Sequence, residues 1–202
     1  DTSVISEGLY YQGKEMKLFK TINKFIKNKE YEKALNDCIE ILIINPLNDY
    51  AYYTCGYCLE KLERYEDAID KFKIAFEINP KSEHYLWHCA NCLRRQDRYE
   101  EAISKFTEVT ILNPEDYAAY GAWGDCLREI SRYEEADEQY QKAISINPKY
   151  EDAYLAWARS FILQEQYNKA IEKYELLLEI NPQKENAYIA WASLLSKQNQ
   201  YV

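Results

Sequence analysis

The sequence has few of the residues that mark catalytic loops, membrane anchors or nucleic-acid contacts. Its 202 residues include two histidines, five glycines and one methionine, and acidic residues outnumber lysine and arginine by 34 to 25. The glycines form neither a phosphate-binding loop nor a G-x-S-x-G elbow, and two histidines leave few choices for a general base. The net charge of −9 argues against nucleic-acid binding, which needs a surplus of lysine and arginine. No apolar run is long enough to span a bilayer, and no signal peptide is recognisable.

The five prolines follow a constant spacing. Each one follows an asparagine, and successive pairs are 34 residues apart, with prolines at Pro46, Pro80, Pro114, Pro148 and Pro182. Two further columns share the period: Ala34, Ala68, Ala102, Ala136, Ala170 and Tyr31, Tyr65, Tyr99, Tyr133, Tyr167. A fixed period without insertions indicates a stack of identical supersecondary units.

Each repeat has the pattern of two antiparallel helices. In the second repeat, Tyr52, Cys55, Gly56 and Leu59 form an i, i+3, i+4, i+7 stripe, and a similar stripe begins at Ala68. Each Asn-Pro ends a second helix, because proline disfavours helical geometry in the residue before it. Helices of about 13 residues are marginal alone in water, so we expect stacking to stabilise them.

Adjacent acidic residues lie where these second helices begin. Examples are Glu100, Glu101, Glu134 and Glu135. Carboxylates are stabilised there by the positive end of the helix dipole, so a capping role accounts for them. We therefore predict that the chain is not an enzyme and that it needs no cofactor.

The period, the alanine column, the terminal proline and the aromatic column Phe72, Phe106, Tyr140 and Tyr174 resemble the tetratricopeptide repeat family. The resemblance covers residues 15–202 as repeats 15–48, 49–82, 83–116, 117–150 and 151–184, with a partial sixth at 185–202. Residues 1–14 form a lead-in, either frayed or part of the first helix. The resemblance implies an all-α fold, a right-handed α-solenoid of antiparallel helix pairs. Asp137 departs from it by taking an apolar place in the fourth repeat.

The two ends of the chain suggest that it is part of a longer protein. It begins with Asp1 rather than methionine, and Tyr201 falls 34 residues after Tyr167, where a further helix would start. We expect the last helix to expose an apolar face. The alternative is that a partner or a second copy of the chain covers this face, which would be self-association through the C-terminal helix.

Two CxxC pairs raise the question of a zinc site. They are Cys55 with Cys58 and Cys89 with Cys92, and His84, His88 and Cys92 also share one side of a helix. Packing accounts for them better, since Cys55 and Cys89 fall in the column of Trp123 and Trp157. We predict no metal. Six cysteines without a disulfide framework suit a reducing compartment, and we expect a cytoplasmic protein.

The first helix of each pair lines the concave face of such a stack, and its side opposite the buried stripe is our candidate binding surface. It carries residue types that dominate interface energies: Tyr50, Tyr53, Tyr57, His84, Trp87, Asn91, Arg94, Arg95, Arg128 and Arg159. We expect this groove to take an extended or helical peptide with apolar anchors and acidic residues. The alternative is that the tyrosines pack between repeats and the arginines pair with nearby acids.

The family resemblance implies a non-catalytic protein–protein interaction scaffold that binds a peptide or partner protein in the concave groove. An alternative is a regulatory or substrate-presenting region of a larger enzyme. RNA binding is a further rival, against which the acidity speaks. Some family members clamp the acidic C-terminal tails of chaperones. The positions of this chain that correspond to the clamp are Phe19, Asn23, Thr54, His84 and His88. Only Asn23 matches the clamp's basic and asparagine residues, so the resemblance argues against a chaperone tail as the ligand.

Overall fold

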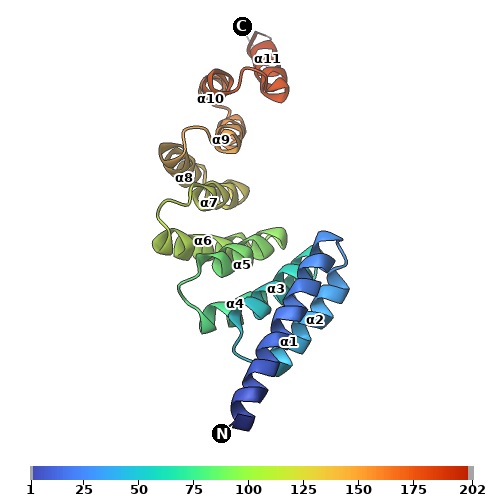
Figure 1. Cartoon of the computed structure of the whole chain (residues 1–202). Coiled ribbons are helices and arrows are strands. Elements are labelled where there is room, and N and C mark those ends of the chain that lie inside the picture. The colour runs from blue at the N-terminus through green and yellow to red at the C-terminus, as the bar shows by residue number, and fades with distance from the viewer. Residues whose placement is uncertain (1, 200–202) are drawn as a thin grey trace. The chain divides into compact units, whose positions relative to one another are not determined.

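The computed structural model describes residues 2–199, and the side chains of residues 12–196 within them. This part of the chain forms eleven α-helices and no strand (Figure 1). They are α1 (Thr2–Lys27), α2 (Tyr31–Ile44), α3 (Asp49–Lys61), α4 (Tyr65–Ile78), α5 (Glu83–Arg95), α6 (Tyr99–Leu112), α7 (Tyr117–Glu129), α8 (Tyr133–Ile146), α9 (Glu151–Leu163), α10 (Tyr167–Ile180) and α11 (Glu185–Asn199). Within the described range, none of them has the length and apolarity of a membrane span.

The second helix of each pair ends at the Asn-Pro dipeptide, as the sequence predicted. The backbone N–H of Asn45, for example, still donates to the Ile41 carbonyl at 2.8 Å, and Ile44 is the last helical residue. The Asn45 side chain then accepts from the Leu47 N–H at 3.3 Å, which turns the chain toward α3. In the second repeat the Asn79 amide instead donates to Asp49 at 2.7 Å.

The turn inside each pair contains a residue in the left-handed region. Positive φ angles of 57° to 60° occur at five non-glycine residues: Lys29, Glu63, Asp97, Ser131 and Glu165. Residues with a side chain adopt this conformation rarely. It lets the chain reverse while the last carbonyls of the first helix stay satisfied, as when the Arg64 N–H donates to the Leu59 carbonyl at 2.9 Å.

The helices divide into two compact units, the first ending at Arg98 and the second beginning at Tyr99. In the first unit α1–α5 pack on one another in chain order, around a core that includes Ile22, Cys38, Ile41 and Phe72. In the second unit α6–α11 do the same around Leu127, Tyr140, Tyr174, Leu177 and other residues.

Small residues allow the helices of a pair to approach closely. A Cβ on Gly56 would lie 2.7 Å from Cε1 of Phe72, and one on Gly124 would lie 2.7 Å from Cε1 of Tyr140. Both rings are fully buried. The two glycines therefore stand where the aromatic column of the second helix presses against the first helix.

Three expectations from the sequence concern the two ends of the chain and the fourth repeat. Helix α1 runs without interruption through residues 2–14. Helix α11 leaves Tyr188, Ile189 and Leu195 exposed, while Tyr201 lies outside the described residues. Asp137, in its apolar column, is half-buried and accepts hydrogen bonds from Ser160 at 3.0 Å and Gln164 at 3.4 Å.

Candidate functional site

In the first unit, α3 and α5 form the sides of an open cleft of about 400 Å³. Four of the residues predicted from the sequence line it: Trp87, Asn91, Arg94 and Arg95. Glu60, Lys61, Glu63 and Tyr65 complete the lining. We call this cleft, together with Tyr50, Tyr53 and Tyr57 of α3, the α3–α5 surface.

The tyrosines of α3 form a connected ring cluster with the next repeat. The Tyr53 ring lies 5.9 Å from that of Tyr50, 5.4 Å from Tyr85 and 6.0 Å from the buried Phe72. Tyr50 in turn contacts Phe19 of α1 at 5.3 Å and keeps 48% of its surface exposed. Tyr53 thus packs between repeats, while Tyr50 remains accessible.

His88 is the centre of this cluster, and the sequence did not indicate that role. Its ring lies 5.3 Å from Tyr53, 6.0 Å from Tyr57 and 5.2 Å from Trp87, so it connects three of the four aromatic residues of the candidate binding surface. A signal was present in the repeat column, which holds the small residues Thr54, Ala122 and Ala156 in the second, fourth and fifth repeats. A large polar side chain at a position where these repeats have a small residue indicates an unusual contact.

His88 also joins α5 to α3 through hydrogen bonds. Its Nε2 lies 3.2 Å from the Tyr53 hydroxyl, and its Nδ1 lies 2.7 Å from a Glu60 carboxylate oxygen. Burial acts to raise the pKa of Glu60, but the contacts with His88 and Lys61 outweigh it and hold the pKa below its ordinary value. Glu60 is therefore an internal partner and offers little charge to a ligand.

Trp87, Asn91 and Arg94 form a hydrogen-bonded row along α5. The Asn91 amide donates to the Trp87 carbonyl at 2.9 Å, and Arg94 Nη2 donates to Asn91 Oδ1 at 3.2 Å. The buried Arg94 Nε has no hydrogen-bond partner among the described residues. Arg95 and His84, at the two ends of α5, are exposed. These hydrogen bonds hold the Arg94 side chain at the cleft, and its Nε–H is a hydrogen-bond donor that is not yet used.

Arg128 and Arg159 belong to the second unit. Arg128 is largely buried and donates to Asp125 at 2.8 Å, to Glu129 at 2.7 Å and to the Tyr140 hydroxyl at 3.1 Å. Burial opposes its charge, but these neighbours together hold its pKa above the ordinary value. Arg128 therefore follows the alternative to ligand binding, in which the arginines pair with nearby acids. Arg159, on α9, is exposed.

All six cysteines are buried free thiols. Interactions with the Cys55 and Cys58 thiols, and then burial, raise the pKa of Cys38, and burial chiefly raises that of Cys92. A protonated buried thiol behaves as a small apolar side chain. Over the residues that the structure describes, no three His, Cys, Asp or Glu side chains are placed to hold a metal ion.

Three segments of the chain match family models of the repeat. Residues 49–82 and 153–188 match models described as tetratricopeptide repeat, and residues 124–159 match one described as TPR repeat. The chain is therefore a tetratricopeptide repeat protein, as the residue columns predicted. No curated protein matches the chain.

Solved structures with the same fold are numerous. YrrB, described as a TPR protein with an unusual peptide-binding site, is 22% identical, with a TM-score of 0.71 over 86% of this chain and 89% of that one. MamA from Desulfovibrio magneticus RS-1 is 18% identical, with a TM-score of 0.79 over 85% and 97%. A tetratricopeptide repeat protein from Parabacteroides merdae is 18% identical, with a TM-score of 0.81 over 93% and 74%.

These similarities confirm the all-α solenoid class built from antiparallel helix pairs. The repeats also define a class of protein, the protein-interaction scaffolds, which are typically non-catalytic.

Proposed function

We propose that the α3–α5 surface binds a segment of a partner protein that carries apolar anchors and acidic residues. The observation that supports this most is the cleft itself, in which the half-buried Trp87 stands beside three cations, Lys61, Arg94 and Arg95. Aromatic and arginine side chains contribute most of the energy at protein interfaces. The acidic residues of the partner would face the cations, and its apolar residues would face the rings.

The local charge supports an apolar anchor as the main source of affinity. Two carboxylates, Glu60 and Glu63, line the cleft with the three cations, so its excess of positive charge is small. Glu60 is paired with His88 and Lys61, which leaves the two arginines as the groups available to an acidic ligand. We therefore expect only a moderate weakening of binding as salt rises.

The proposal concerns the first unit. Arg128 has its donors engaged by Asp125, Glu129 and Tyr140, so it is a weaker candidate contact than Arg94. Arg159 stays a candidate on α9 because it is exposed. The buried free thiols suit a reducing compartment, and we propose that the protein is located in the cytoplasm.

The test is selection of peptides from a random displayed library on the 202-residue chain, followed by affinity measurements on variants. Trp87→Ala and the double variant Arg94→Ala/Arg95→Ala should each weaken the selected peptides by at least about tenfold. Arg64→Ala is the matched control, because it removes an exposed arginine of the same unit outside the cleft. Equal affinity of wild type and both cleft variants would show that the peptides bind elsewhere.

A further inference from the structure

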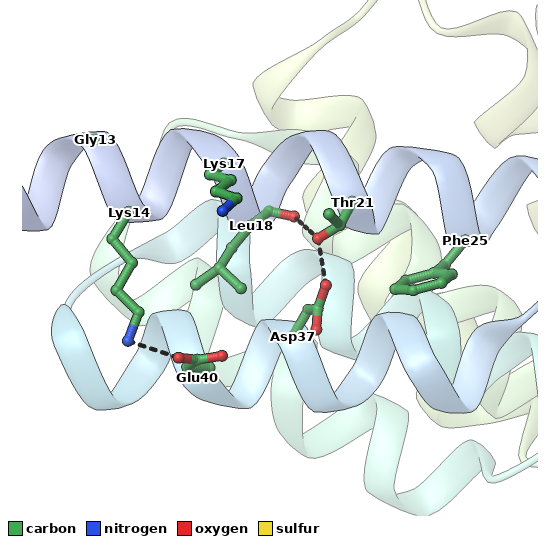
Figure 2. Close-up of a pocket in the computed structure, with 8 residues that line it drawn as sticks. All are labelled: Gly13, Lys14, Lys17, Leu18, Thr21, Phe25, Asp37 and Glu40. Carbon is green, nitrogen blue, oxygen red and sulfur yellow. Dashed lines mark hydrogen bonds and ion pairs between the residues drawn. The ribbon is translucent and has the colours of Figure 1, made fainter.

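A groove of about 710 Å³ lies between α1 and α2, and all of its lining residues belong to these two helices. Figure 2 shows Leu18 and Phe25 pointing from α1 toward α2, where they give the groove an apolar floor. Both side chains are half-buried. We call this hollow the α1–α2 groove.

In the second repeat, the corresponding place is occupied by a helix. Cys55 and Leu59 are the counterparts of Thr21 and Phe25, because each lies 34 residues later. They line one small pocket with three apolar residues of α2 at i, i+4 and i+7, which are Leu35, Ile39 and Leu42. Leu59 is only 2% exposed there, so the second helix of the first repeat covers this position in the second.

The same cover recurs in the second unit. Ile103 of α6 packs against the core cluster that contains Leu127, and Ile144 of α8 packs against the cluster that contains Phe161. Leu127 and Phe161 are further counterparts of Phe25, and both are buried. In these repeats, too, the second helix of the preceding repeat supplies the apolar residues.

The described part of the chain does not supply such a helix to the first repeat. Helix α1 runs without a turn through residues 2–14 (Figure 1), whereas α3 begins at Asp49, directly after an Asn-Pro turn. The apolar floor of the α1–α2 groove is therefore left open at the place where a helix packs in the later repeats.

A row of lysines flanks the groove on the α1 side. Lys17 lines it, and Lys20 and Lys24 follow at i+3 and i+7, on the same side of the helix. All three are exposed, and none forms an ion pair within the described part of the chain. The column of Lys17 holds buried residues in the later repeats: Ala51, Tyr85, Ala119, Ala153 and Ala187. The repeat fold therefore does not require a cation at this position.

The acids that line the groove from α2 are already engaged within the chain. Glu40 pairs with Lys14 at 2.6 Å, and Asp37 is hydrogen-bonded to Thr21 (Figure 2). The available charge at the groove is therefore positive and lies on one side of it only.

We propose that the α1–α2 groove binds an amphipathic helix of a partner protein, placed as the second helix of a preceding repeat would be. Apolar residues of the partner at i, i+4 and i+7 cover Leu18 and Phe25, which is the spacing of helix-in-groove recognition. A row of aspartate or glutamate on one side of that helix faces the lysines, and this charge complementarity sets the rotation of the helix in the groove. The site is separate from the α3–α5 surface.

The test is selection from a displayed library of 14-residue helices, the length of α2, held helical by an internal cross-link and randomised in sequence. The bait is the 202-residue chain. We expect the selected helices to carry apolar residues at i, i+4 and i+7 and an excess of aspartate and glutamate on one side. Selected helices with an excess of lysine and arginine, or no selected helix, would overturn the proposal.

Two variants test whether the selected helices bind in the groove. Leu18→Ala removes part of the apolar floor and should weaken them at least about tenfold. Lys17→Gln/Lys24→Gln removes two charges and should weaken them about fivefold, with unchanged circular dichroism because both side chains are exposed. The matched control Lys73→Gln/Lys81→Gln removes two exposed lysines outside the groove and should leave the affinity unchanged. An affinity that neither groove variant lowers would overturn the proposal.

Two further measurements separate this site from other surfaces. Arg94→Ala/Arg95→Ala should leave the affinity of the selected helices unchanged, and a loss would assign them to the α3–α5 surface instead. The second measurement uses vesicles of phosphatidylcholine and phosphatidylserine, to which we expect no binding. Vesicle binding that Lys17→Gln/Lys24→Gln abolishes would mean that the lysine row contacts a lipid surface, and would overturn the proposal.

Discussion

The Nδ1 of His88 lies 2.7 Å from a carboxylate oxygen of Glu60, and this contact ties α5 of the third repeat to α3 of the second. Both side chains are largely buried, at 16% and 18% exposure. Because the His88 ring contacts Tyr53, Tyr57 and Trp87, the pair also holds the ring cluster in place.

Glu60→Gln should destabilise the first unit by about 1 kcal/mol at neutral pH, because a charge-assisted hydrogen bond becomes a neutral one. The pKa of Glu60 in the folded chain lies below its ordinary value of 4.5, so the carboxylate adds stability above that pH. This contribution is lost as the pH falls through the lower, folded pKa. Urea unfolding followed by circular dichroism should show the two proteins converging in acid. Glu77→Gln, an exposed glutamate of α4, should match wild type throughout.

Gly56→Ala should destabilise the chain although alanine is the better helix former. The added Cβ would lie 2.7 Å from Cε1 of the fully buried Phe72, so the helix pair must separate. The matched substitution is Gly13→Ala in α1, where a Cβ would meet nothing within 4 Å. That variant should gain up to about 1 kcal/mol from helix propensity. Thermal unfolding of the two variants should shift in opposite directions, and shifts of the same sign would contradict the packing argument.

Tyr140→Phe should reduce the stability of the second unit by about 1 kcal/mol. The Tyr140 hydroxyl donates to Asp125 at 3.0 Å and accepts from Arg128 at 3.1 Å. Tyr174→Phe in the next repeat is the control, because the Tyr174 hydroxyl makes no hydrogen bond within the described part of the chain and only the ring is packed. Urea unfolding should separate the two variants. Equal losses would mean that the hydroxyl contacts contribute nothing.

Asp137→Asn should raise the thermal midpoint at pH 7. Burial raises the pKa of Asp137 and outweighs its hydrogen bonds from Ser160 and Gln164. With a folded pKa above the ordinary 3.8, the ionised carboxylate becomes a source of instability as pH rises through this range. Asparagine keeps an acceptor for Ser160 without the charge, so the gain should disappear in acid. Asp70→Asn, at an exposed site on α4, should give no comparable gain.

The sequence by itself determined the helix pairs and where most of them end. The restriction that a proline places on the preceding residue is local, so Asn45 and its four counterparts predicted the ends of α2, α4, α6, α8 and α10. Local rules missed the left-handed residues, such as Glu63, because no glycine marks them. Helix packing selects that conformation against the ordinary preference of the residue.

Only the tertiary structure decided which side chains of the candidate surface are available. The sequence placed Tyr53 and Trp87 on one face, but the contact of His88 with Tyr53 depends on how α5 packs against α3. The pairing of Arg128 with Tyr140 likewise depends on the antiparallel approach of α7 and α8. Periodicity fixes the direction of a side chain from its own helix. Its partners come from the neighbouring helix, whose distance and register are set by packing.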